Sequence, residues 1–151
     1  MLYLCTYSLS IFTVKVICMT QIARIDSIAS NHAEKLKSIG ITTVEGFLEV
    51  AATPAGRKSI AKQAKLSEKL VLKWANHADL FRIKGIAGLK AELLEASGVV
   101  TMAQLAKQKP DALYEKMLGI NDKKKLVLRV PGIVQVKKWV ATAKRMKRVV
   151  R

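Results

Sequence analysis

The chain has 151 residues, half of them hydrophobic and few of them aromatic, which fits one helical domain or two small halves sharing a core better than a β-sandwich. Its 27 Lys and Arg outnumber 11 Asp and Glu, for a net charge of +16. A small protein this basic usually meets a polyanion, so we expect nucleic acid first and an anionic membrane surface second. The remaining alternative is a charge that only keeps the protein in solution.

Residues 1–18 form an apolar leader, MLYLCTYSLSIFTVKVIC, with one charge at Lys15. Three interpretations stay open. A membrane span is interrupted by Lys15, and a secretory signal lacks its basic start and its cleavage site. Alternatively the leader is upstream sequence translated in error, because Met19 begins an ordinary cytosolic start; we therefore expect a cytoplasmic protein. Cys5 and Cys18 both lie in the leader, which leaves the body without a disulfide framework or a thiolate metal site.

One segment of the sequence occurs twice after the leader. Residues 25–43, IDSIASNHAEKLKSIGITT, match residues 83–101, IKGIAGLKAELLEASGVVT, at eight of nineteen positions. A fixed offset of this kind indicates a duplicated unit. One such unit cannot bury its own apolar face, but two can pack together.

Each copy predicts a short helix, a turn, a second helix, a Gly stop and a capped short helix. In the second copy Gly98 stands where a left-handed residue ends a helix, and Thr101 with Gln104 forms a capping box. In the first copy we expect the capping box at Thr42 and Glu45.

The segment IKGIAGLKAELL resembles a helix-hairpin-helix motif. Gly85, Ile86 and Ala91 match the motif, whereas Ala87 stands where its second Gly is usual. The first copy departs further, because it has Ser27 and Ala29 at the two Gly positions while keeping Ile28 and Ala33.

From about Ile25 to about Lys144 the chain resembles a bacterial family of tandem helix-hairpin-helix proteins, catalogued as a domain of unknown function. The resemblance implies an all-α fold in which two helix-hairpin-helix-like repeats pack with additional helices in one compact domain. We place this domain at residues 19–148, followed by a basic tail end at 149–151.

Helix-hairpin-helix motifs bring backbone N–H groups and a helix N-terminus to a phosphate, and so hold DNA without reading its bases. The second hairpin could do this, whereas for Ser27 to Ser30 we favour a plain corner of the core. Basic residues near the C-terminus would add to the site. The predicted nucleic-acid site consists of Lys84, Gly85, Ile86, Ala87, Gly88, Lys90, Lys137, Lys138, Lys144, Arg145, Lys147 and Arg148.

Between the repeats the pattern predicts two helices. Thr53 caps the first, with Pro54 at its first position, and Ser67 caps the second. The pair is either a linker or a helix-turn-helix reader of DNA. The second interpretation depends on an expected basic face made of Arg57, Lys58, Lys62, Lys65, Lys69 and Lys73.

The C-terminal part carries most of the charge. A helix is expected from Pro110 through Leu118, and Asn121 is expected to cap another that ends before Pro131. Residues 121–151 hold eleven basic residues and one acidic residue, a net charge of +10. The last helix is therefore expected to bind phosphates. Two alternatives stay open: it could equally lie on an anionic membrane, or it could be a solvent-exposed helix without a ligand.

Catalytic patterns are lacking, so we predict a protein that is not an enzyme and has no cofactor and no metal. His32 and His77 are expected at or near the surface, with no ligand partners at metal spacing. The prediction is sequence-independent nucleic-acid binding, with double-stranded DNA as the first candidate. The alternative is a protein-interaction module with degenerate hairpins, recognisable by an exposed apolar groove near Trp74 or Trp139. A membrane partner enters only if the leader is retained.

Overall fold

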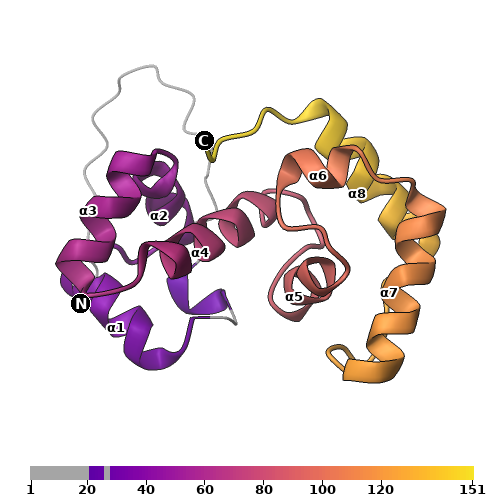
Figure 1. Cartoon of the computed structure of the whole chain (residues 1–151), viewed down its shortest axis with the longest axis horizontal. Helices are drawn as coiled ribbons and strands as arrows, with labels where there is room; N and C mark the ends of the chain where they lie inside the picture. The colour runs from indigo at the N-terminus through magenta and orange to yellow at the C-terminus, as the bar shows by residue number, and fades with distance from the viewer. Residues whose placement is uncertain (1–20, 26–27) are drawn as a thin grey trace, which may run out of the picture.

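The computed structural model describes residues 21–25 and 28–151. The leader at 1–18 and Ser27 of the first hairpin lie outside the described residues. Within them the chain forms a compact all-α domain of eight α-helices and one 3-10 helix, without a strand (Figure 1). The elements are η1 (Ile22–Arg24), α1 (Ser30–Ser38), α2 (Val44–Ala51), α3 (Pro54–Ala64), α4 (Glu68–Leu80), α5 (Leu89–Ala96), α6 (Met102–Ala106), α7 (Pro110–Lys124) and α8 (Ile133–Arg145).

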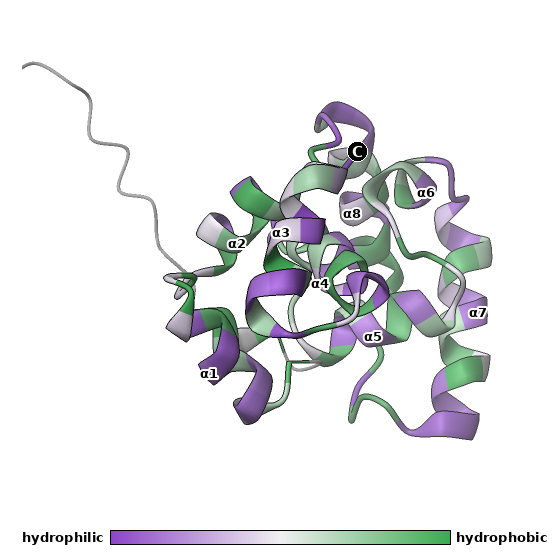
Figure 2. Cartoon of the chain, turned by 60° about the vertical axis from the view of Figure 1, so that its left-hand side comes forward, coloured by the Kyte–Doolittle hydropathy of each residue, from purple (hydrophilic) through white to green (hydrophobic). Residues whose placement is uncertain are grey.

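The interior consists of two hydrophobic clusters. The N-terminal cluster, around Phe47 and Trp74, gathers residues of η1 and α1 to α4. The C-terminal cluster, around Trp139, gathers residues of α5 to α8 together with Leu80 at the end of α4. Helix α4 therefore belongs to both clusters, and Figure 1 shows it crossing the middle of the molecule. In Figure 2 hydrophilic and hydrophobic stretches alternate along α7, as expected for a helix with one face on the core.

Several local expectations are confirmed. Thr101 and Gln104 make both bonds of a capping box at the start of α6. Gly98 follows α5 with φ +87°, in the left-handed region that favours glycine. Thr53 caps α3 through a bond from Gly56 N–H, and Pro54 occupies the first turn.

Two helix caps differ from the sequence-based expectation. Helix α2 is capped by Thr43, not Thr42, because Thr43 Oγ1 accepts the N–H of Gly46 at 3.1 Å. The carbonyl of Thr42 instead accepts the N–H of Ile22 at 3.0 Å, which ties the chain before α2 to η1. Ser67 holds the N-cap position of α4, but its side chain makes no capping bond.

The expected break after Leu118 is wrong, since α7 runs on to Lys124. Asn121 is buried within this helix and does not begin a new one. Its side-chain amide donates to the carbonyl of Val127 and accepts from the N–H of the same residue, both at 2.9 Å. Lys125, with φ 51°, ends α7 in the left-handed conformation.

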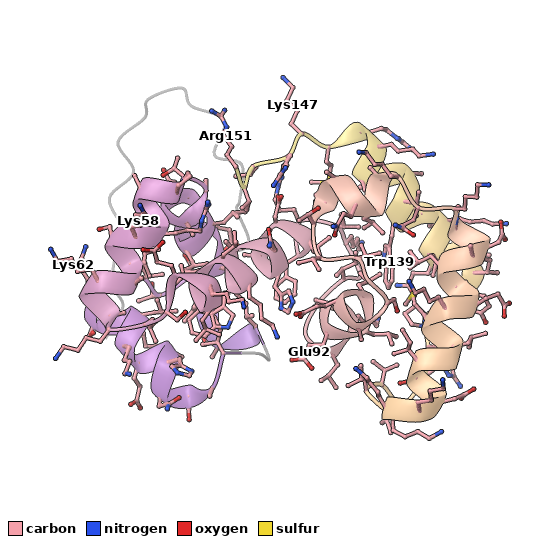
Figure 3. The ribbon with its side chains drawn as sticks, viewed as in Figure 1. Lys58, Lys62, Glu92, Trp139, Lys147 and Arg151 are labelled. Carbon is pink, nitrogen blue, oxygen red and sulfur yellow. The ribbon has the colours of Figure 1, made fainter. Side chains whose placement is uncertain are left out.

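Arg57 was expected on a basic face but is buried, with 9% of its surface exposed. Its guanidinium donates to the carbonyl oxygens of Ala51 at 2.8 Å, Ala52 at 3.2 Å and Arg151 at 2.7 Å. Arg151 N–H in turn donates to Ala52, and the side chain of Val150 is buried in the N-terminal cluster. Arg57 thus fixes residues 149–151 against α2 and α3, where Figure 3 shows Arg151.

In the part of the chain that the structure describes, no helix is both long and apolar enough to cross a membrane.

Candidate nucleic-acid interface

The second hairpin lies between α4 and α5. Its turn is closed by a bond from Ile86 N–H to the carbonyl of Ile83 at 3.1 Å. Gly85 has φ +95° and Gly88, the N-cap of α5, has φ +50°. Side chains are strained at both values, so glycine is the residue expected at each position.

The hairpin is seated on α8. A Cβ atom at Gly85 would lie 2.8 Å from Gln135 Nε2 and 3.3 Å from Trp139 Nε1. The absence of a side chain at Gly85 therefore lets the hairpin backbone approach α8. This packing role does not exclude a ligand, because Gly85 remains exposed to solvent.

The hairpin amides are not equally free to bind a phosphate. The N–H of Ile86 is used inside the turn, and its side chain is buried in the C-terminal cluster. Gly85 and Ala87 are exposed, and their N–H groups have no acceptor among the described residues. Gly88 is buried behind them. Only the outer part of the hairpin can thus offer backbone donors.

Three of the predicted cations surround one hollow of about 310 Å³ beside the hairpin. Lys84 comes from the hairpin, and Lys138 and Arg145 lie about two turns apart along one side of α8. Trp139 and Thr142 also line the hollow, and no acidic side chain is among the described residues that line it. The fold therefore brings the second hairpin and α8, which are distant in the sequence, together at one cationic surface. We call this surface the basic hollow.

The other predicted basic residues are not among those that line the basic hollow. Lys90, in the first turn of α5, is half-buried. Lys137 points to α7, where its Nζ lies 3.4 Å from Asp111 Oδ1. Three more are exposed at the end of α8 and beyond it, namely Lys144, Lys147 and Arg148. Sequence reasoning missed Thr142 and Gln135, which contact this region but carry no charge that would have marked them.

His77 was expected near the surface, but only 1% of it is exposed. Its Nε2 lies 2.8 Å from Glu95 Oε2, and Lys73 Nζ lies 3.3 Å from the same oxygen. Burial lowers the pKa of His77 from 6.5, and this outweighs the opposing effect of Glu95. A neutral His77 therefore donates to the Glu95 carboxylate and links α4 to α5. His32 is half-buried, as expected.

This pair gives the protein an expected pH dependence. Because the pKa of His77 is lower folded than unfolded, only the unfolded chain takes up the proton as pH first falls below 6.5. The contribution of His77 to the free energy of unfolding should be greatest above that pH. Below it, this free energy should decline by up to about 1.4 kcal/mol per pH unit. Urea unfolding across this range should show the decline in the parent and in His32→Gln. It should be weaker in His77→Gln, whose amide can still donate to Glu95; equal slopes would contradict the assignment.

Metal ligands do not converge in the described part of the chain, where no group of three or more suitable side chains could hold an ion.

No curated protein and no solved structure matches this chain. One family does, over residues 26–146, and it is described as a domain of unknown function, DUF4332. The match takes in α1 to α8, all the α-helices among the described residues, and extends into the segment that follows α8. Since it covers most of the sequence, the chain belongs to the DUF4332 family.

Proposed function

We propose that this protein binds nucleic acid through phosphates, without sequence preference and without catalysis, and that double-stranded DNA is its first candidate ligand. The observation that carries the proposal is the basic hollow, where Lys84, Lys138 and Arg145 converge and none of the described lining residues is acidic. Gly85 and Ala87 of the same hairpin are exposed residues, and their N–H groups have no acceptor among the described residues. Lysine and arginine beside free backbone donors are the groups that hold a phosphate.

We also infer that the eight helices are two copies of one four-helix unit, each opening with a helix-hairpin-helix-like turn. Matching features support this. Gly40 ends α1 as Gly98 ends α5, each with a bond from the following residue's N–H back to Leu36 or Leu94. The same pairing holds for the caps Thr43 and Thr101, for Pro54 and Pro110 at the starts of α3 and α7, and for the left-handed Lys65 and Lys125. Helix α2 packs on α4 as α6 packs on α8.

The two copies differ in charge at the hairpin. Asp26 stands in the sequence where the second copy has Lys84. An acidic residue at that position would repel a phosphate. We therefore assign phosphate binding to the second hairpin alone and a packing role to the first.

The protein-interaction alternative has less support. It required an exposed apolar groove near Trp74 or Trp139, and both side chains are buried, at 0% and 1% exposure. The hollow beside Trp139 has cations at its rim, which suits an anion better than an apolar side chain.

Fluorescence anisotropy with a labelled DNA duplex over a salt series tests the proposal. The variant Lys84→Gln, Lys138→Gln, Arg145→Gln removes the three cations of the hollow. If each neutralises one phosphate, the slope of log affinity against log salt should fall by about three, with at least tenfold weaker binding at low salt. Charge substitutions suit this test better than a valine at Gly85, which would also disturb packing on α8.

The matched control is Lys58→Gln, Lys62→Gln, Lys69→Gln, in which three exposed lysines of the N-terminal half are replaced. Both variants carry a net charge of +13, three less than the parent's +16. Figure 3 shows Lys58 and Lys62 on the opposite side of the molecule from Trp139. Equal losses in the two variants would contradict a localised site, and no binding by the parent at about 50 mM salt would overturn the function.

A further inference from the structure

One leucine side chain projects fully into the solvent. Leu128, in the loop between α7 and α8, is as exposed as in a free peptide, at 109%. The apolar residues around it behave differently, because Leu126, Val127 and Val130 are partly buried against the C-terminal cluster. The loop therefore packs its other apolar side chains inward and leaves this one outside.

The loop that carries Leu128 is held in place. The two bonds from the buried amide of Asn121 fix the backbone of Val127, directly before Leu128. Pro131 is buried on the other side of the tip, and its ring restricts the backbone. The backbone position of Leu128 is thus set by the fold, so that its entry into a partner would cost side-chain rotamer freedom but little backbone entropy.

Cations flank this leucine along the chain. The end of α7 brings the exposed Lys123, Lys124 and Lys125, and Arg129 follows Leu128 directly. Along the sequence only Asp122 opposes them between residues 122 and 132. In the fold Glu92 and Glu95 of α5 line a hollow together with Lys124, whereas Leu128 and Arg129 are not among its lining residues. A single apolar side chain between positive charges is complementary to a polyanion in which stacked apolar groups lie between two rows of negative charge.

We propose that Leu128 is a wedge that enters the minor groove of duplex DNA and partly unstacks one base step, while the neighbouring cations contact phosphates on either side. The inference rests on the proposed function, since it needs a bound duplex. Minor-groove proteins insert leucine and similar side chains between base pairs in this way and bend the duplex as they do so. A lipid surface fits less well, because it takes up a broad apolar face and here one side chain projects.

A duplex that contains 2-aminopurine tests the wedge, because this base fluoresces more strongly when it is unstacked. Binding of the parent should raise the fluorescence. Leu128→Ala should abolish the rise and weaken binding about tenfold, the order expected for losing one buried leucine. The salt slope should not change, because no cation is removed. Leu128→Met should restore much of the rise.

Val134→Ala is the matched control, since Val134 is a second exposed apolar residue, at 64%, close to the same loop in sequence. It should leave both fluorescence and affinity unchanged. Because the side chain of Leu128 is fully exposed, its variants should unfold at the parent's midpoint.

The outcomes separate the two proposals. Duplex binding without a fluorescence rise, or a rise that survives in Leu128→Ala, overturns the wedge and leaves the basic hollow standing. No duplex binding overturns both. Binding to phosphatidylglycerol vesicles that depends on Leu128, with no 2-aminopurine response, would replace the wedge with a lipid contact.

Discussion

Replacing Arg57 with methionine should lower the free energy of unfolding by about 3 kcal/mol, because three backbone carbonyls lose a charged donor in a buried place. Ala52 retains its bond from the N–H of Arg151, whereas the carbonyls of Ala51 and Arg151 lose the guanidinium. At this chain length the melting temperature should fall by roughly 10 °C. Thermal unfolding followed by circular dichroism measures the change.

Lys58→Met is the control, since it removes the same charge from the next residue of α3, where the side chain is exposed. Its effect should stay within about 0.5 kcal/mol. Arg57→Lys should fall between the two, because an ammonium group keeps the charge but cannot span the same three acceptors in a planar fork. If Arg57→Met were as mild as the control, Arg57 would not hold residues 149–151 in place.

The parts of the fold that could be predicted are those encoded within a few residues. The capping box at Thr101, the helix stop at Gly98 and the start of α3 at Pro54 each depend on one turn of chain. The errors also have local causes. Thr42 and Thr43 can both cap a helix by residue type, but the repeat pairs Thr43 with Thr101, and that pairing was the signal for the cap that α2 uses.

Asn121 illustrates a different limit. Asparagine is a good N-cap residue, so the sequence favoured a helix start there. The structure uses the same amide inside α7 to bind Val127 in the following loop. Both uses satisfy the side chain, and the choice depends on how the end of α7 packs on the C-terminal cluster, which no local pattern contains.

Contacts between distant segments could not be predicted at all. Arg57 and Arg151 are 94 residues apart, and His77 and Glu95 are 18 residues apart. In the candidate site, the sequence identified Lys84 and Lys138 as basic residues, but nothing in it indicated that they line one hollow. Charge can be counted from a sequence, whereas its convergence depends on the path of the chain.

Trp139→Ala should also lower the free energy of unfolding strongly, by about 3 to 5 kcal/mol, because it removes a fully buried side chain from the C-terminal cluster. The indole N–H has no acceptor among the described residues, so no hydrogen bond adds to this loss. The result should therefore fall towards the lower end of the range. Val134→Ala on the same helix is exposed and should change stability little.

The same variant can show whether the two clusters unfold together. The chain has two tryptophans, so after Trp139→Ala all tryptophan fluorescence comes from Trp74 in the N-terminal cluster. Helix α4 contributes to both clusters, and Phe81 packs against both. Residues beyond α8 also return to the N-terminal cluster through Val150.

We therefore expect a substitution in the C-terminal cluster to shift the Trp74 transition as far as it shifts the helical circular dichroism. The two urea midpoints should coincide, as they do for a two-state domain. Trp74→Ala, read through Trp139, is the reciprocal test. If Trp74 kept its native fluorescence after half of the helical signal was lost, the N-terminal cluster would be stable without the C-terminal cluster, and the two would not unfold as one domain.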